Sequence, residues 1–347
     1  MKLSRGRTMA VEEYNMLPVL ARFRPLGSWA IFVLAVLSAT MGAGMTRAIA
    51  DDPGVSVQVV REGVAHRPLF GIAFSEDGRR GVAVGDRGTV VSTNDGGNSW
   101  VVEDADTDMA LLDVALAGTR AISAGQMGLV LVRIDGGEWK EQSTSVEERL
   151  MSVDLHPDGL AVAVGGFGQV RISTDGGVAW SAPDTAFSSF IEEGYDPHLY
   201  AVEITKSGRV IVAGEFGLIV VSDDRGASWR VARRGDESLS ALHVREDGIG
   251  FAVGQNGIVL KTVDFGDNWK RVDPGLGGNL LGVSSTPEGL VIVPGMRNML
   301  VSHDDGATFV PVSDPDVNSN WYQQAAAGSN GTFAVGHTGR IVRISTN

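Results

Sequence analysis

A single phrase recurs along this chain and constrains its fold more than any other feature. The phrase begins with apolar residues and a Gly–x–x–Gly turn, continues through a short apolar run, and closes with Ser/Thr–x–Asp–x–Gly–x–x–Trp. One copy reads GVAVGDRGTVVSTNDGGNSW (81–100), and further copies occupy 160–180, 210–229, 250–269 and 290–309. Repeats with a period of about 40 residues are typical of solenoids, propellers and arrays.

The aromatic residues that close the phrase are regularly spaced. Successive ones lie 39, 41, 49, 40 and 40 residues apart, and they are Trp100, Trp139, Trp180, Trp229, Trp269 and Phe309. The copy that ends at Trp139 is degenerate, because it is one residue shorter and lacks the Asp of the closing motif. A last copy (333–347) stops before its closing strand. We therefore count seven units.

Each unit is predicted to fold as short strands. In the first unit, residues 69–75, 80–85, 88–93 and 99–103 are rich in Val and Ile and are bounded by Gly, Asp and Asn turns. Four short strands in about 40 residues are the unit of a β-propeller blade. We therefore predict an all-β fold, a seven-bladed β-propeller of four-stranded antiparallel blades.

An N-terminal strand is predicted to close the ring. The segment VSVQVV (55–60) precedes the first unit and has no partner of its own, whereas the last unit lacks its outer strand. If residues 55–60 supply that strand, the two ends of the chain close the ring. Closure leaves only short, protected strand edges.

The first 50 residues differ in character from the repeats. Basic residues precede an apolar run at 29–45, and TRAIA (46–50) ends in an Ala–x–Ala site before Asp51. This order is typical of a secretory signal peptide; an uncleaved membrane anchor is the alternative, because the basic region is long. We therefore predict a signal peptide at 1–50, a single propeller domain at 51–347 and a periplasmic location. If the signal is not cleaved, residues 29–45 would tether the domain to the membrane.

Charge and cysteine content exclude several classes of function. Residues 1–50 carry a net charge of +4 in a chain of −13, so the exported domain carries −17. Such an acidic domain is not expected to bind nucleic acid or an anionic membrane surface by charge. The chain has no cysteine, which removes disulfides, thiol catalysis and thiolate metal sites. The six histidines are scattered without metal-ligand spacing, so we expect neither a metal nor a cofactor.

The Ser/Thr–x–Asp–x–Gly–x–x–Trp motif, or Asp box, is interpreted as structural. Its Asp accepts hydrogen bonds from the backbone of a turn, its Gly permits positive φ, and its Trp packs between blades. A catalytic group is needed once, whereas these motifs recur around the ring. The structural residues are Asp95 and Trp100, Asp175 and Trp180, Asp224 and Trp229, Asp264 and Trp269, and Asp304 and Phe309.

The variable residues inside the Gly–x–x–Gly turns are the main candidates for binding. In a four-stranded meander these turns share one rim with the connections between blades, and the Asp boxes share the opposite rim. Loops on a rigid scaffold commonly carry binding, with tolerated turn variation as the alternative. The candidate residues are Asp86, Arg87, Gln126, Met127, Phe167, Glu215, Phe216, Gln255, Asn256, Met296, Arg297 and His337.

Two longer connections belong to the same predicted rim. The insertion 181–200 places aromatic residues beside carboxylates, and its candidate binding residues are Phe190, Glu193 and Tyr195. The alternative is a loop that packs its own aromatics. The second connection, 313–322, contains Trp321, which we assign to the core of the last blade.

The motifs do not form a catalytic constellation. Sialidases share the Asp box, but they carry an Arg-Ile-Pro motif that this chain lacks. Glycosidases need paired carboxylates at a fixed separation, whereas the adjacent Glu192 and Glu193 point apart on an extended loop. There is no Gly-x-Ser-x-Gly elbow. A glycan-processing or glycan-binding propeller is the alternative function, and it requires Glu215 to face Asp86 or Glu193 across the channel.

The phrase AVGxxGxV…STDGGxxW, repeated after an export signal, resembles the photosystem II stability/assembly factor family of β-propellers. The resemblance extends over 55–347. It implies a non-catalytic factor that holds a newly made membrane subunit, or an accessory of a resistance-nodulation-type exporter. That family uses an arginine-rich patch; here the matching turns hold Arg87 and Arg297, with Arg233 and Arg234 on another connection.

The expected function is that of an exported, non-enzymatic binding protein. It would act as an assembly or accessory factor for a membrane protein complex. The expected partner is a membrane or exported protein, and contact with a membrane would occur through that partner or through an uncleaved anchor.

Overall fold

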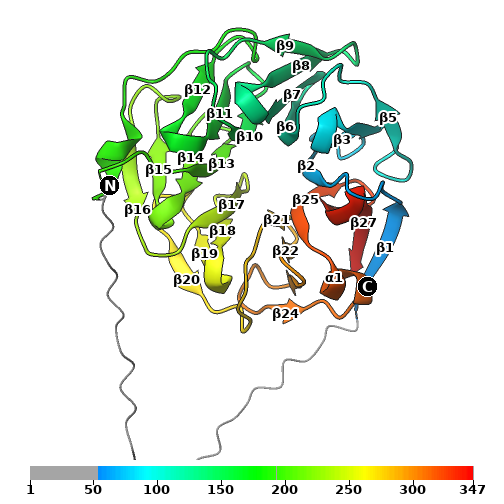
Figure 1. The fold of residues 1–347 in the computed structure, drawn as a ribbon. Helices are drawn as coiled ribbons and strands as arrows, with labels where there is room; N and C mark the ends of the chain where they lie inside the picture. Colours follow the sequence, from blue (N-terminus) through cyan, green and yellow to red (C-terminus); the bar gives the residue numbers. More distant parts are fainter. Residues whose placement is uncertain (1–53, 193, 347) are drawn as a thin grey trace, which may run out of the picture. The chain divides into compact units, whose positions relative to one another are not determined.

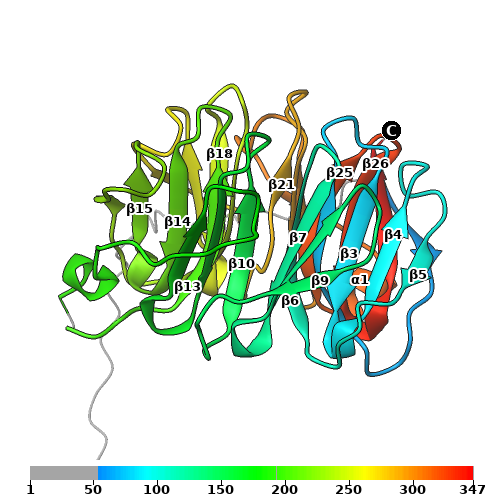
Figure 2. The same cartoon turned by 90° about the horizontal axis from the view of Figure 1, so that it is seen from above.

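The computed structural model describes residues 54–192 and 194–346, and the predicted signal peptide lies outside these residues. Within them, the strands form seven sheets arranged in a ring (Figure 1). Seen from the side, the strands run between the two rims of the ring (Figure 2). The predicted all-β, seven-bladed propeller is confirmed. The described part of the chain contains no helix that is long and apolar enough to cross a membrane.

Each sheet is one blade, and its strands follow one another from the axis outward. Blade 1 consists of β2 (Leu69–Phe74), β3 (Gly81–Gly85), β4 (Val90–Thr93) and β5 (Val101–Glu103). Blade 2 consists of β6 (Leu111–Ala117), β7 (Arg120–Gly125), β8 (Val130–Ile134) and β9 (Lys140–Gln142). Blade 3 consists of β10 (Leu150–Leu155), β11 (Ala161–Gly165) and β12 (Val170–Ser173). Blade 4 consists of β13 (Leu199–Ile204), β14 (Val210–Gly214), β15 (Ile219–Ser222) and β16 (Arg230–Arg233). Blade 5 consists of β17 (Leu239–Val244), β18 (Gly250–Gly254), β19 (Val259–Thr262) and β20 (Lys270–Val272). Blade 6 consists of β21 (Ser284–Ser285), β22 (Val291–Pro294), β23 (Met299–Ser302) and β24 (Val310–Pro311). Blade 7 consists of β25 (Tyr322–Gly328), β26 (Gly331–Gly336), β27 (Ile341–Thr346) and β1 (Val55–Arg61).

The core lies between neighbouring blades, because each blade covers a face of the next. Second strands such as β3, with the sequence GVAVG, and β14, with VIVAG, are buried along their whole length. Strands covered on both faces favour continuous runs of small and β-branched apolar residues. One interblade cluster joins Val162 and Val164 of blade 3 to Val202 and Val210 of blade 4.

The strand β1 closes the ring as predicted. It pairs antiparallel with β27, with Val55 opposite Thr346, and so supplies the outer strand of blade 7. The interface between blades 7 and 1 buries Phe333 completely, and the Phe333 ring centroid lies 5.2 Å from that of Phe74. One sheet therefore holds both ends of the described chain.

Blade 3 departs from the four-stranded unit. It has three regular strands, and Ser181 forms a single bridge with Ile172 where an outer strand would begin. Pro183 follows two residues later and has no N–H group with which to continue a strand ladder. The insertion therefore leaves the sheet at this point.

Candidate functional site

The Gly–x–x–Gly turns form one rim of the ring, together with the connections between blades. Six of them are single 3-10 turns: η1 (Asp86–Gly88), η2 (Gln126–Gly128), η3 (Gly166–Gly168), η5 (Glu215–Gly217), η6 (Gln255–Gly257) and η7 (His337–Gly339). In blade 6, Asn298 stands at the position of the second glycine. The first glycine lies against the preceding connection: a Cβ on Gly85 would lie 2.1 Å from the carbonyl oxygen of Pro68.

The two variable positions of these turns play different structural parts. In blades 2, 4 and 5 the first one faces the connection: the side-chain oxygen of Gln126 accepts a hydrogen bond from the N–H of Ala110 at 3.2 Å, and Glu215 accepts one from the N–H of His198 at 2.8 Å. Gln255 makes the same contact with its own connection. These side chains therefore fix the turns.

The second variable position adopts the left-handed conformation in all seven blades, and none of the seven residues is glycine. The residues are Arg87, Met127, Phe167, Phe216, Asn256, Arg297 and Thr338, with φ of 51°, 56°, 54°, 57°, 55°, 59° and 63°. This conformation strains a residue with a Cβ by about 1–2 kcal/mol relative to glycine. Retained backbone strain of this kind is a reason to consider a function for the side chain.

Six of the twelve exposed large apolar side chains of the described residues lie on this rim. Phe167 is 62% exposed and Met127 is 61% exposed. The others are Val64, Met109, Tyr195 and Met296.

An aromatic cluster lies over blades 3 and 4. The ring centroids of Phe167 and His198 are 4.7 Å apart, and the Phe167 N–H donates a hydrogen bond to His198 Nδ1 at 3.1 Å. Tyr195 packs edge-on against Phe216 at 5.7 Å. Burial and the nearby Glu215 carboxylate raise the pKa of Tyr200, beside His198, to about 12. The structure thus brings the predicted residues Phe167, Tyr195 and Phe216 onto neighbouring blades.

A second aromatic group lies where blade 7 meets blade 1. Trp321 stacks on Phe70 at 6.2 Å and contacts His337 at 5.9 Å. The prediction that Trp321 belongs to the core of the last blade is wrong, because Tyr322 takes that place with 1% exposure. The short helix α1 (Pro315–Ser319) precedes this group.

The insertion 181–200 contributes less to the rim than expected. Phe187 is buried and packs against Trp229 at 5.3 Å, and Phe190 packs against Phe187 at 5.4 Å. The guanidinium of Arg234 donates a hydrogen bond to the Phe190 carbonyl at 2.6 Å. Phe190 therefore extends the core of blades 3 and 4, while the end of the insertion carries Tyr195 to the rim. Glu193 lies outside the described residues.

Sequence analysis missed the residues that surround the mouth of the central channel. Six of the seven inner strands have a register shift near their first residue, and such bulges re-aim a side chain. The skipped residues are Phe70, Leu112, Met151, Tyr200, Ser240 and Gln323, and all of them line a cavity of about 360 Å³ on the axis. The sequence did contain a signal for these bulges. Each unit starts with a Leu or Tyr that is followed two positions later by a small or polar residue, and the skipped residue lies between them.

Deeper in the channel, carboxylates bind the free edges of the inner strands. Asp113 accepts hydrogen bonds from the hydroxyl of Ser152 at 2.8 Å and from the Val153 N–H at 3.1 Å. Asp154 accepts one from the Ile204 N–H at 2.6 Å. Each carboxylate therefore joins its own blade to the next.

The middle of the channel also contains a Glu–His pair. Glu203 Oε1 lies 3.4 Å from His243 Nδ1, and His243 Nε2 lies 3.3 Å from the carbonyl oxygen of Ser285. Burial lowers the pKa of His243, but the Glu203 carboxylate, the Ser285 carbonyl and the charge of Asp154 together raise it by more, so the pKa lies above its ordinary value. Because Nε2 is directed at a backbone carbonyl, this histidine does not activate the Ser285 hydroxyl.

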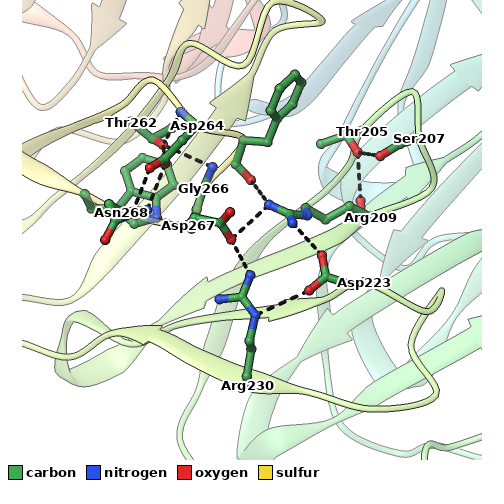
Figure 3. A network of polar contacts seen from close by, with 12 residues as sticks. Thr205, Ser207, Arg209, Asp223, Arg230, Thr262, Asp264, Gly266, Asp267 and Asn268 are labelled. Carbon is green, nitrogen blue, oxygen red and sulfur yellow. Dashed lines mark hydrogen bonds and ion pairs between the residues drawn. The ribbon is translucent and has the colours of Figure 1, made fainter.

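The Asp boxes lie on the opposite rim, where each Asp gathers the groups of its own turn. Asp264 accepts hydrogen bonds from the Thr262 hydroxyl at 2.8 Å and the Asn268 N–H at 2.9 Å (Figure 3). The Trp269 indole N–H donates to the Gly266 carbonyl. Equivalent bonds to the hydroxyl and N–H of Ser99 and Ser228 lower the pKa of Asp95 and Asp224 to about 2.

Ion pairs beside these turns connect blades 4 and 5. Arg209 contacts Asp223 at 2.6 Å and Asp267 at 3.0 Å, and Arg230 contacts the same two carboxylates (Figure 3). The acids of these ion pairs, Asp223 and Asp267, flank the Asp boxes in the sequence, whereas the predicted residue Asp264 bonds within its own turn. Among residues 54–192 and 194–346, no group of three or more His, Asp or Glu side chains is placed to hold a metal ion.

The fold is a seven-bladed propeller, and its Gly–x–x–Gly rim is the candidate site. A structure of YCF48 bound to a D1 peptide matches with a TM-score of 0.67 and 19% identity, over 86% of this chain and 99% of that chain. YCF48 from Cyanidioschyzon merolae matches with a TM-score of 0.67 and 21% identity, over 83% of this chain and 98% of that chain. The fold is therefore that of a propeller like the photosystem II assembly factor.

An enzyme shares the same architecture. The GH74 xyloglucanase from Xanthomonas campestris matches with a TM-score of 0.65 and 17% identity, over 82% of this chain and 53% of that chain. A scan against protein-family models and a search of curated proteins found no match. At these identities the likeness shows the fold, and the function has to be argued from the site.

Proposed function

We propose that this protein is an exported, non-enzymatic binding protein that captures a protein partner on the Gly–x–x–Gly rim. The observation that carries the proposal is the second turn position: all seven blades hold a side chain in strained left-handed backbone, and three of these side chains are Met127, Phe167 and Phe216. Glycine would form the turn with less strain. Left-handed residues also occur in the Asp boxes, as at Phe265, so the proposal depends on the exposed Met127 and Phe167 side chains at these positions together with the strain.

The composition of the rim supports a protein partner. Aromatic side chains and methionine are enriched in the buried centres of protein interfaces. Here Met127 and Phe167 are exposed on blades 2 and 3, and Tyr195 is exposed on the connection between blades 3 and 4. Phe216 of blade 4 contacts Tyr195 and is partly buried against the interblade core. The YCF48 structure supports the proposal by analogy, since that propeller binds a peptide.

We further propose that the partner is a membrane or exported protein and that the chain acts as its assembly or accessory factor in the periplasm. The signal sequence predicted at 1–50 supports export. The intact mass of the purified mature chain tests this step. A chain that begins at Asp51 supports cleavage and export, whereas a chain that retains 29–45 supports the membrane tether.

Capture from detergent-solubilised membranes tests the rim. The native protein is compared with a rim variant that combines Phe167→Gly, Phe216→Gly and Tyr195→Ala. Phe265→Gly is the matched control, because Phe265 is also exposed and left-handed, with φ of 57°, but lies in an Asp box on the opposite rim. We expect one membrane or exported protein to be enriched by the native and Phe265→Gly proteins and lost by the rim variant.

Two results would contradict this proposal. Equal capture by all three proteins would place the binding surface elsewhere. Hydrolysis of a xyloglucan or sialoside substrate by the native protein, with no protein captured, would favour the glycan-processing alternative instead.

A further inference from the structure

In five blades, the second glycine of the Asp box packs against the preceding blade. A Cβ on Gly97 would lie 2.3 Å from the ring of Phe333, and one on Gly306 would lie 2.5 Å from the ring of Phe251. The same contact with the preceding blade occurs at Gly177, Gly226 and Gly266. The motif therefore seals the Asp-box end of these interblade interfaces.

Blade 2 lacks this seal, because its copy of the motif is one residue shorter. Apart from its immediate neighbours, a Cβ on Gly136 would meet no atom within 4 Å, and one on Gly137 would meet the Ile134 carbonyl of its own turn and nothing of blade 1. At the position where blades 5 and 7 have phenylalanine, blade 1 has the smaller Val82. A cavity of about 150 Å³, lined by Val82 and Gly136 among others, lies between blades 1 and 2 at this place.

The lining of this interblade cavity is positively charged. Its charged residues are Arg80, Arg120, Arg133 and Glu103. Three arginines against one glutamate leave an excess of two positive charges, although the exported domain as a whole is strongly acidic. The cavity also has exposed residues at its margin, among them Thr119 and Gly136, so it opens to solvent on the Asp-box rim.

Glu103 balances one of the three arginines. Its carboxylate is paired with Arg133 and accepts a hydrogen bond from the Trp139 indole N–H at 3.0 Å. Burial raises the pKa of Glu103, but the bonds from Ser92, Trp139 and Arg133 lower it by more, so the carboxylate is ionised at neutral pH. The two charges that remain in excess are those of Arg80 and Arg120.

Neither Arg80 nor Arg120 forms an ion pair with a carboxylate of the described residues. Arg80 donates to the backbone carbonyl of Gly118, and Arg120 donates to that of Asp175 at 2.8 Å. Arg80 acts on Asp77 through space, but the Asp77 carboxylate is bonded to a hydroxyl and an N–H of its own turn. A guanidinium has five N–H donors, and these bonds use one donor of each arginine.

Blade 4 shows how an arginine at the same position is neutralised. Arg209, like Arg80 and Arg120, stands five residues before the first glycine of its Gly–x–x–Gly turn. Arg209 contacts Asp223 at 2.6 Å and Asp267 at 3.0 Å. The interface between blades 1 and 2 therefore has the arginines of this arrangement without its two carboxylates.

We propose that the cavity between blades 1 and 2 binds a small divalent oxyanion, such as hydrogen phosphate or sulfate, through Arg80 and Arg120. Two guanidinium groups without counter-charges match two negative charges, and the planar fork of arginine binds oxyanions with paired hydrogen bonds. The volume of the cavity lies below the range of about 300–1,000 Å³ that small-ligand sites occupy, so it suits an ion and not a nucleotide or an oligosaccharide. The bound anion joins blades 1 and 2 where the Asp-box seal is missing.

Isothermal titration calorimetry of the native protein with sodium phosphate and with sodium sulfate tests this site. Sodium chloride at the same ionic strength is the reference, because it accounts for general screening. We expect saturable binding of one phosphate or sulfate ion, and binding of acetate, which carries one charge, that is at least tenfold weaker. Saturating phosphate should also raise the melting temperature relative to the chloride reference.

Variants locate the site. Arg80→Gln and Arg120→Gln should each weaken phosphate binding at least tenfold. Arg80→Lys and Arg120→Lys keep the charge and decide the matter if the glutamine variants do not fold; each should weaken binding at least threefold, because an ammonium group lacks the planar fork. Val82→Phe keeps every charge but fills the cavity with the residue that blades 5 and 7 have at this position, and it should abolish saturable binding. Arg209→Gln is the matched control, and it should bind phosphate as the native protein does.

Three results would overturn this inference. The first is a titration in which phosphate gives no saturable heat beyond that of chloride, or in which acetate binds equally well. The second is native affinity in the folded variants of Arg80 and Arg120, or in Val82→Phe. The third is an equal loss of binding in Arg209→Gln, which would mean that phosphate responds to surface charge in general. Each of these results leaves partner capture by the opposite rim to be judged on its own experiment.

Discussion

Replacing Phe167 by Gly and by Ala separates the role of the side chain from the strain of its backbone. Phe167 has φ of 54° and is 62% exposed, so its ring adds little to the core. Glycine relieves about 1–2 kcal/mol of left-handed strain, but it gives the unfolded chain about 0.5–1 kcal/mol of extra entropy. Losing the edge-on contact with His198 removes about 0.5–1.5 kcal/mol. The free energy of unfolding of Phe167→Gly should therefore stay within about 1 kcal/mol of the native value.

Alanine loses the ring but keeps the strain. Phe167→Ala should therefore be about 1 kcal/mol less stable than Phe167→Gly. Urea denaturation of the three proteins, with midpoints and m-values compared, measures this order, and partner capture should fall in both variants. An Ala variant as stable as the Gly variant would refute the strain argument, and native-level capture by both variants would refute a binding role for this side chain.

Three further perturbations test the ring and the channel. Phe333→Ala should lower the free energy of unfolding by about 3–5 kcal/mol, because Phe333 is fully buried between blades 7 and 1; a loss below about 1 kcal/mol in urea would contradict this packing. Deleting 54–61 should lower the urea m-value and promote self-association, since β27 loses its partner and becomes an exposed edge; an unchanged m-value and a monomeric protein would remove the closure argument. Asp154→Asn should stabilise the protein at pH 9 more than at pH 5. The pKa of Asp154 is raised from 3.8 to about 8 on folding, so its ionisation increasingly opposes folding between these values; thermal melts that show the same difference at both pH values would contradict the raised pKa.

The blades and their closure were predictable because they follow from local chemistry repeated many times. The Gly–x–x–Gly turns and the apolar runs, such as VIVAG at 210–214, indicate where strands begin and end. The unpaired apolar segment at 55–60 and the incomplete last unit together predicted the pairing of β1 with β27. Each of these signals depends on residues that are near one another in the sequence.

The channel could not be predicted in the same way, because it depends on how seven blades meet. Asp113, Asp154 and Glu203 are isolated acids in inner strands that otherwise resemble one another, and only the ring brings them together. Likewise, the register shift at the start of β25 and the bridge between Trp321 and Met296 place Trp321 on the rim and Tyr322 in the core. Adjacent aromatic residues cannot be assigned to a face until the register is known.

The location of the candidate rim was predictable from the sequence, but the orientation of its side chains was not. Sequence spacing put the variable turn residues on one rim. Which of the two positions faces outward depends on backbone dihedrals: Gln126 turns inward to the connection, whereas Met127 is left-handed and exposed. The insertion at 181–200 shows the same limit, since Phe190 entered the core while Tyr195 reached the rim.

Site-specific photocrosslinking in the native membrane environment is the most direct test of partner binding by the rim. A photoreactive amino acid replaces Phe167 in one protein and Phe265, on the opposite rim, in another. Residue type and backbone conformation are matched, and both side chains are exposed, by 62% and 40%. Binding by the Gly–x–x–Gly rim predicts one dominant crosslinked protein from position 167 and none from position 265. A crosslink to the same protein from position 265 alone, or from both positions equally, would contradict it.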